Sequence, residues 1–171
     1  LPFGRSASWA RWSVAVYFSF ATHSLADFFT VYGTQIFWPL TNHPFAHSIL
    51  FIVDPIYTIP LLVAVISALL MRDRSRAVKI NAGMLGLSTL YLVWSTGAKS
   101  VIDNRVQNAL ASNGISSEVY DSTPAPLNTL LWRGVAVDDD AYFEIWASIF
   151  DDVDQIQIQG FPRNVELIST I

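Results

Sequence analysis

The amino-acid sequence predicts a mainly α-helical integral membrane protein, a bundle of about three spans with a small C-terminal extramembrane α+β segment that contains a β-hairpin. Of the 171 residues, 52% are hydrophobic and only 14% are charged, whereas soluble domains usually carry about 25% charged residues. A soluble all-helical core is the alternative. We expect a transmembrane helical domain over residues 1–100 and an acidic extramembrane domain over residues 101–171.

Three apolar stretches approach the roughly 20 residues that a helix needs to cross the bilayer core. They cover residues 12–29, 49–71 and 80–98. The second is the most apolar, because Asp54 is its only charged residue. The third is rich in small residues, which suit close packing of helices in lipid. Each stretch is therefore predicted to form one membrane span.

Basic residues predict the orientation, because cytoplasmic segments of membrane proteins are enriched in Lys and Arg. They precede the first stretch and fill the connection between the second and third: Arg5, Arg11, Arg72, Arg74, Arg76 and Lys79. With three spans, both groups fall on the same side. We expect a multi-pass protein of the bacterial inner (plasma) membrane with its C-terminal domain on the outer, periplasmic side.

The chain becomes polar and acidic after residue 100. A helix is predicted to continue over residues 101–111. Residues 131–137 and 141–149 flank an acidic turn and predict a hairpin, and residues 154–159 alternate like a third strand. The formal net charge of −4 argues against nucleic acid as a partner, because nucleic-acid binding needs a basic surface.

The chain contains no cysteine, which excludes disulfides, thiolate metal sites and cysteine nucleophiles. A metal ion would have to be held by histidine, carboxylate or carbonyl ligands. The sequence also lacks a glycine-rich phosphate loop and a serine-hydrolase elbow.

His23 and Asp27 form the first candidate pair for chemistry. They are four residues apart, so a helix presents them on one face. Ionisable residues within a membrane are costly and are functional candidates for that reason. Histidine with a carboxylate suits a divalent metal ion. The alternative is that Asp27 only orients His23, or that both residues lie among the lipid head groups.

Asp54 is the third candidate, because antiparallel packing of the first two spans would bring it to the depth of His23 and Asp27. The alternative is an N-cap, since Asp followed by Pro commonly begins a helix. In the loop between the spans, His43 and His47 are also four residues apart and are secondary candidates. Exposed polar surface is the alternative for that pair.

Two runs of the sequence, residues 23–35 (HSLADFFTVYGTQ) and 51–60 (FIVDPIYTIP), resemble the signature of the YdjM-like family of inner-membrane metal-dependent hydrolases. Residues 91–95 and 123–132 extend the resemblance. It implies a multi-span helical protein with a metal-dependent hydrolase activity. The family's His and Asp correspond to His23 and Asp27, and its Asp-Pro to Asp54. Family members have an upstream part with further His and Asp residues, so we interpret the sequence as a fragment that lacks it.

The predicted function is a membrane-bound, metal-dependent hydrolase that acts on an ester or phosphoester near the outer membrane face. His23, Asp27 and Asp54 are the predicted metal ligands, and Asp27 and Asp54 the catalytic groups. A divalent metal ion, Zn²⁺ in the first instance, is the expected cofactor. The lipid bilayer and a lipid or phosphoester substrate are the expected partners. The alternative is a non-catalytic membrane protein, an ion or proton relay or a scaffold, with an extramembrane interaction domain.

Overall fold

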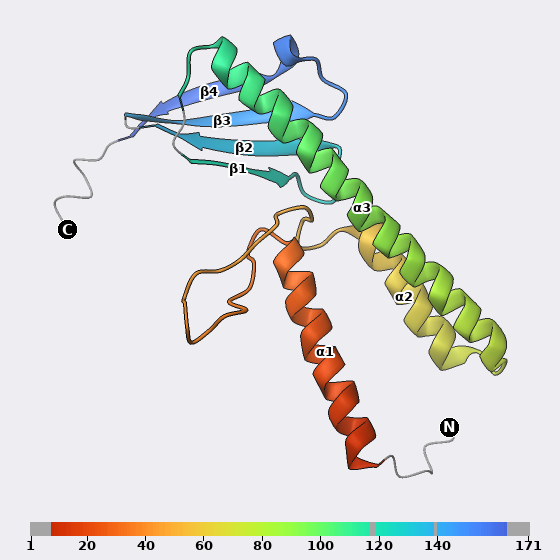
Figure 1. Ribbon diagram of the computed structural model, residues 1–171. Helices are drawn as coiled ribbons and strands as arrows, with labels where there is room; N and C mark the ends of the chain where they lie inside the picture. Colours follow the sequence, from red (N-terminus) through yellow and green to blue (C-terminus); the bar gives the residue numbers. More distant parts are fainter. Residues whose placement is uncertain (1–7, 117–118, 139, 164–171) are drawn as a thin grey trace. The chain divides into compact units, whose positions relative to one another are not determined.

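The computed structural model describes residues 8–116, 119–138 and 140–163, and within them three α-helices precede a four-stranded sheet (Figure 1). The chain divides into two compact units, Leu1–Ser48 and Ile49–Ile171. Arg5 and Asp139, which entered the predictions of orientation and of the acidic turn, lie outside the described residues.

The first unit consists of helix α1 (Trp9–Phe29) and the loop that follows it. The loop folds back on itself through a bridge in which the backbone N–H groups of Thr34 and Phe45 each donate to the other's carbonyl, at 3.0 and 2.9 Å. Gly33 allows this turn: its φ is +64°, and a Cβ there would lie 2.6 Å from the Phe45 carbonyl oxygen. The His47 N–H then donates to the Phe28 carbonyl at 2.7 Å, which returns the loop to the end of α1.

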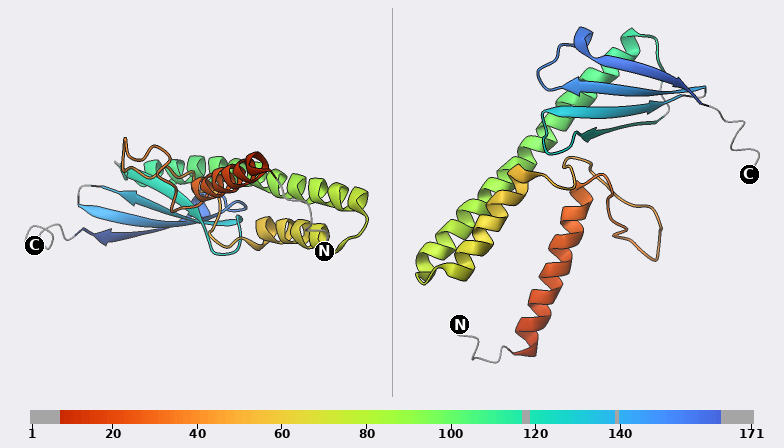
Figure 2. Two further views of the ribbon diagram at one scale, coloured as in Figure 1. Left: turned by 90° about the horizontal axis from the view of Figure 1, so that it is seen from below. Right: turned by 180° about the vertical axis from the view of Figure 1, so that it is seen from behind.

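The second unit begins with an antiparallel helix pair, α2 (Pro55–Leu70) and α3 (Arg74–Ser112). Figure 2 shows the two helices side by side in both views. Polar side chains tie them together: Asn81 Nδ2 donates to the Ala64 carbonyl at 3.1 Å, and Ser88 Oγ donates to the Tyr57 carbonyl at 3.0 Å. Such hydrogen bonds stabilise helix pairs where hydrophobic burial contributes little, as in lipid.

Helix α3 is 39 residues long, and its C-terminal half leaves α2 and packs against the sheet (Figure 1). Apolar residues at four-residue intervals present one face to the sheet. The buried core of this contact is formed by Ala98, Ile102, Val106, Leu110, Trp132, Ala136, Ile145 and Ala147. One continuous helix therefore packs against α2 in its N-terminal half and against the sheet in its C-terminal half.

The sheet is an antiparallel meander in the order β1-β2-β3-β4. Its strands are β1 (Val119–Pro124), β2 (Leu131–Val137), β3 (Ala141–Ser148) and β4 (Gln157–Pro162), with a short 3₁₀ helix, η1 (Val153–Gln155), before the last. Alternate residues of β2 and β3 are buried against α3. The residues between them form a second face that α3 does not cover; we call it the open face.

The structure corrects the predicted fold class. Within the described residues only α3 is long and apolar enough to cross a membrane, so the expected three-span bundle is wrong. The stretch 49–71 does not form a membrane-spanning helix, because α2 starts only after Asp54, at Pro55, and is 16 residues long. The stretch 80–98 is the middle of α3 and not a helix of its own. In α1, serine, threonine, histidine and aspartate lower the hydropathy of the stretch 12–29.

The C-terminal segment follows the prediction more closely. The predicted hairpin is present as β2 and β3, and the predicted continuation over residues 101–111 is the end of α3. The predicted third strand, residues 154–159, is displaced: η1 occupies its start and β4 begins at Gln157. Strand β1 was not predicted, because its sequence, VYDSTP, has no apolar alternation.

Candidate functional site

The structure brings His23 and Asp27 together on the last turns of α1. His23 Nε2 lies 3.5 Å from Asp27 Oδ2, as the spacing predicts. The side chains are 75% and 44% exposed, so both donor groups can be reached from outside the first unit. A histidine nitrogen and a carboxylate oxygen at this separation can bind one divalent ion between them.

The secondary candidates His43 and His47 belong to the loop after α1 and do not share a helical face. The His47 ring stacks on Phe28, with centroids 5.9 Å apart and an interplanar angle of 8°. The His43 ring meets Phe45 edge to face at 5.3 Å. Both imidazoles therefore pack on aromatic rings. No three His, Cys, Asp or Glu side chains gather into a metal-binding group in the part of the chain that the structure describes.

Asp54 lies in the second unit and caps α2. Its Oδ1 accepts hydrogen bonds from the backbone N–H groups of Ile56 and Tyr57, at 2.9 and 3.3 Å, and Pro55 occupies the first helical position. The residue is 1% exposed. The capping alternative is thus realised, whereas the convergence of Asp54 with His23 and Asp27 stays a prediction.

The second oxygen of Asp54 begins a buried polar chain. Tyr91 in α3 donates its hydroxyl hydrogen to Asp54 Oδ2 at 2.7 Å, and the same hydroxyl lies 3.1 Å from Thr129 Oγ1 in the β1–β2 connection. The Thr129 carbonyl in turn accepts from Trp132 Nε1 at 2.9 Å. This polar chain joins α2, α3 and the sheet within one unit.

Sequence reasoning did not assign a role to Tyr91 or Thr129. The sequence did offer one signal for a role of these residues, because both lie in segments that carry the family resemblance, residues 91–95 and 123–132. Their partner could not be read from local spacing, because 37 and 38 residues separate the members of the two contacts.

Ser95 stands one helical turn beyond Tyr91 and is fully buried. Its hydroxyl lies near that of Tyr91 but has no hydrogen-bond partner among the residues that the structure describes. No cationic side chain of the described residues forms an ion pair with Asp54 either. Burying a carboxylate without a counter-charge is costly. Its three hydrogen bonds and the positive end of the α2 dipole offset that cost.

Lys99 anchors the next turn of α3 to β1. Its Nζ donates to the Ser122 carbonyl at 2.6 Å and to Ser122 Oγ at 2.9 Å, and it lies 3.4 Å from Asp121 Oδ1. Asp103 completes this cluster by accepting from Ser122 Oγ and from the Tyr120 hydroxyl. Burial raises the pKa of the Tyr120 phenol, and the neighbouring Asp103 carboxylate raises it further.

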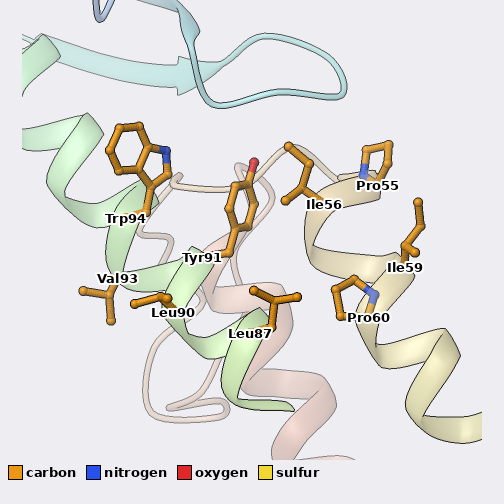
Figure 3. A pocket seen from close by; sticks show the side chains of 9 residues that line it. All are labelled: Pro55, Ile56, Ile59, Pro60, Leu87, Leu90, Tyr91, Val93 and Trp94. Atoms are coloured by element: carbon orange, nitrogen blue, oxygen red, sulfur yellow. The ribbon is translucent and has the colours of Figure 1, made fainter. Parts of the chain in front are cut away.

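An apolar groove of about 710 Å³ runs between α2 and α3 (Figure 3). It is lined by Pro55, Ile56, Ile59, Pro60, Leu87, Leu90, Tyr91, Val93 and Trp94. Figure 3 shows the Tyr91 ring between the two helices, with its hydroxyl directed toward the sheet end of the pair. The groove offers contact to apolar groups, and the Tyr91 hydroxyl at its lining is already bound to Asp54.

Comparison with known proteins identifies one family. Residues 1–101 match the family model described as YdjM inner membrane protein. No curated protein and no solved structure matches the chain. The matched region contains α1, α2 and the part of α3 that includes Tyr91, whereas the sheet lies beyond it.

Proposed function

We propose that the chain, which belongs to the YdjM family of inner membrane proteins, is a metal-dependent hydrolase that cleaves an ester or phosphoester bond at that membrane. The observation that carries the proposal is the His23–Asp27 pair, whose donor atoms are 3.5 Å apart and exposed on α1. Exposure leaves room for the further ligands and the substrate that a catalytic ion needs.

The two donors suit a divalent ion of the Zn²⁺ class. Imidazole nitrogen and carboxylate oxygen are common ligands of Zn²⁺, and a catalytic Zn²⁺ usually has three protein ligands. His23 and Asp27 would supply two of them. The resemblance assigns the third to Asp54, an assignment that a substitution retaining the cap can test. When bound, such an ion supplies Lewis-acid activation of water and of the scissile group.

Hydrolysis also needs a group that moves protons, and Asp27 is suited to this. The oxygen of water forms a bond to the carbonyl carbon or phosphorus, the bond to the leaving alcohol oxygen breaks, and the alcohol gains a proton. A carboxylate has two oxygens, so Asp27 could hold an ion with one and accept the water's proton with the other. Asp54 is less suited to this step, because both of its oxygens already accept hydrogen bonds.

The exposed side chains of α1 support a lipid-linked substrate. Helix α1 exposes large aromatic side chains, among them Trp12 and Phe20. Exposed apolar surface of this extent favours contact with lipid. An ester of a lipid or lipid-linked compound could then reach His23 and Asp27 without leaving the membrane surface.

We also expect the sheet to lie on the periplasmic side. Basic residues gather at the N-terminal end of α3 and just before it: Arg72, Arg74, Arg76 and Lys79. Positively charged ends of membrane helices face the cytoplasm. If α3 crosses the membrane, the sheet at its other end faces outward.

Metal analysis of the full-length native protein, purified without chelator, tests the proposed function. We expect a stoichiometric divalent ion in the wild type and its loss in His23→Ala and Asp27→Ala. His43→Ala is the matched control and should keep the ion. A panel of aryl esters and phosphodiesters then tests turnover, which the same two variants should lose. Wild-type levels of metal and turnover in the double variant would refute the assignment.

A second candidate function is a non-catalytic membrane protein whose sheet domain binds a partner. The observation that favours it concerns Asp54, the implied third metal ligand. Both oxygens of Asp54 already accept hydrogen bonds, which cap α2 and hold α3, so the residue has a structural role without a metal ion. Wild-type protein without stoichiometric metal and without turnover would support this function.

A further inference from the structure

The open face of the sheet contains a polar hollow that the proposed function does not use. Its volume is about 360 Å³, and it is lined by Leu131, Trp146, Asp151, Gln155 and Gln157. These residues come from β2, β3, β4 and the segment that joins β3 to β4. The hollow lies within the second unit and shares no residue with the His23–Asp27 pair.

Trp146 forms the aromatic wall of the hollow. It pairs with Arg133 on β2 and with Gln157 on β4. Its neighbours in β3, Ile145 and Ala147, are buried against α3. Side chains alternate between the two faces of a strand, so the Trp146 indole lies on the open face, where it is half-buried.

The far wall of the hollow is held in place from behind by α3. Arg105 Nη1 donates to the carbonyls of Ile149 and Asp151, at 2.8 and 2.6 Å. Asp151 Oδ2 accepts from the Ser148 N–H at 2.7 Å, and Gln155 Oε1 accepts from the Asp152 N–H at 3.1 Å. The wall is therefore pre-organised, which lowers the entropy cost of binding a ligand.

These bonds leave hydrogen-bonding capacity around the indole. Among the described residues, three side-chain groups have no hydrogen-bond partner: Asp151 Oδ1, Gln155 Nε2 and the side-chain amide of Gln157. The hollow thus offers an aromatic surface, a carboxylate acceptor and amide groups that both donate and accept. Its volume falls within the usual range of small-ligand sites, about 300–1,000 Å³.

We propose that this hollow binds a neutral saccharide. The apolar C–H face of a sugar ring stacks on an indole, while its hydroxyl groups donate to a carboxylate and exchange hydrogen bonds with amides. The charges around the hollow favour a ligand without negative charge. No Lys or Arg among the described residues lines it, Arg133 on the same face is paired with Glu144, and Asp151 would repel an anion.

Calorimetric titration of the full chain tests the saccharide site. The protein is kept in a detergent without a sugar head group, because such head groups would compete. Cellotetraose, maltotetraose and chitotetraose are the probes. The decisive variant is Gln157→Ala, and its matched control is Gln159→Ala, an exposed residue of the same strand and face that lies outside the hollow. Trp146→Phe and Trp146→Ala test the aromatic wall.

We expect at least one tetrasaccharide to bind the wild type and Gln159→Ala equally. Loss of the Gln157 hydrogen bonds should weaken binding about fivefold to tenfold. Trp146→Ala should abolish binding, whereas Trp146→Phe should retain part of it. The proposal is overturned if no tetrasaccharide binds the wild type, if Gln157→Ala binds like the wild type, or if a neutral tetrapeptide binds more tightly than every sugar. Metal content and hydrolysis are independent of these results.

Discussion

The Tyr91 hydroxyl lies 2.7 Å from Asp54 Oδ2 and joins the start of α2 to the middle of α3. Thr129 shares this hydroxyl at 3.1 Å, which extends the link to the sheet. Asp54 and Thr129 are both almost completely buried. A buried polar chain of this kind is stabilising only while each member keeps its partners, because an unmatched buried group keeps its full desolvation cost.

Replacing Tyr91 by Phe should therefore destabilise the second unit. The substitution removes the donor to Asp54 Oδ2 and leaves that buried oxygen without its partner. We expect a loss of about 1–3 kcal/mol in the free energy of unfolding, the usual cost of an unsatisfied buried group. Thermal unfolding followed by circular dichroism measures it. Tyr57→Phe is the control, because no described residue hydrogen-bonds the Tyr57 hydroxyl; an equal loss in both variants would contradict the explanation.

Two substitutions at Asp54 separate its structural role from metal binding. Asn caps a helix about as well as Asp, so Asp54→Asn should keep the start of α2, whereas Asp54→Ala should lose about 0.5–2 kcal/mol from the cap alone. Unfolding measurements compare the two variants.

Metal content then decides the chemical role of Asp54. If Asp54 is the third ligand, Asp54→Asn should lose the ion while remaining folded, because the amide carries no negative charge. If the folded Asp54→Asn protein retains the ion, Asp54 is not a ligand, and the third ligand beside His23 and Asp27 is another residue.

The sequence predicted elements whose signals are local. The β2–β3 hairpin follows from two strand-like segments on either side of an acidic turn, the second of which alternates, and the shared face of His23 and Asp27 follows from their spacing. The cap at Asp54 was an open alternative because Asp-Pro is itself a local pattern.

Features that depend on distant contacts were not predicted. Strand β1 is polar in sequence and is stabilised by pairing with β2 and by the Lys99–Ser122 hydrogen bonds. The membrane spans were overestimated because apolar content was counted without the helix start that Asp54 and Pro55 impose. The pairing of β1 is not visible in a window of neighbouring residues. The start of α2 is a local pattern, but the apolar residues on both sides of it outweighed that pattern in the prediction.

The raised pKa of Tyr120 predicts a loss of stability in alkali. In the unfolded chain a tyrosine has a pKa of about 10. In the folded protein, burial and the Asp103 carboxylate raise the pKa of Tyr120 above that value. The folded state therefore binds more protons above about pH 10, and the free energy of unfolding falls as the pH rises from there. Unfolding measured from pH 8 to 11 should show this decline.

Tyr120→Phe should flatten the alkaline decline, although it also removes the hydrogen bond to Asp103 and so lowers stability at neutral pH. Tyr142→Phe, on the open face of the same sheet, is the control for removing a tyrosine. A wild-type decline that persists unchanged in Tyr120→Phe would assign the alkaline loss to another group.

The absence of cysteine in the chain allows a direct test of orientation, since each introduced cysteine is unique. Ser75→Cys lies in the basic first turn of α3, and Gln159→Cys lies on exposed β4 at the other end of the second unit. If α3 crosses the inner membrane with its basic end in the cytoplasm, a membrane-impermeant maleimide should label Gln159→Cys in intact spheroplasts. Ser75→Cys should be labelled only after lysis. Equal labelling of both cysteines before lysis would mean that α3 does not separate two compartments, and the reverse pattern would put the sheet in the cytoplasm.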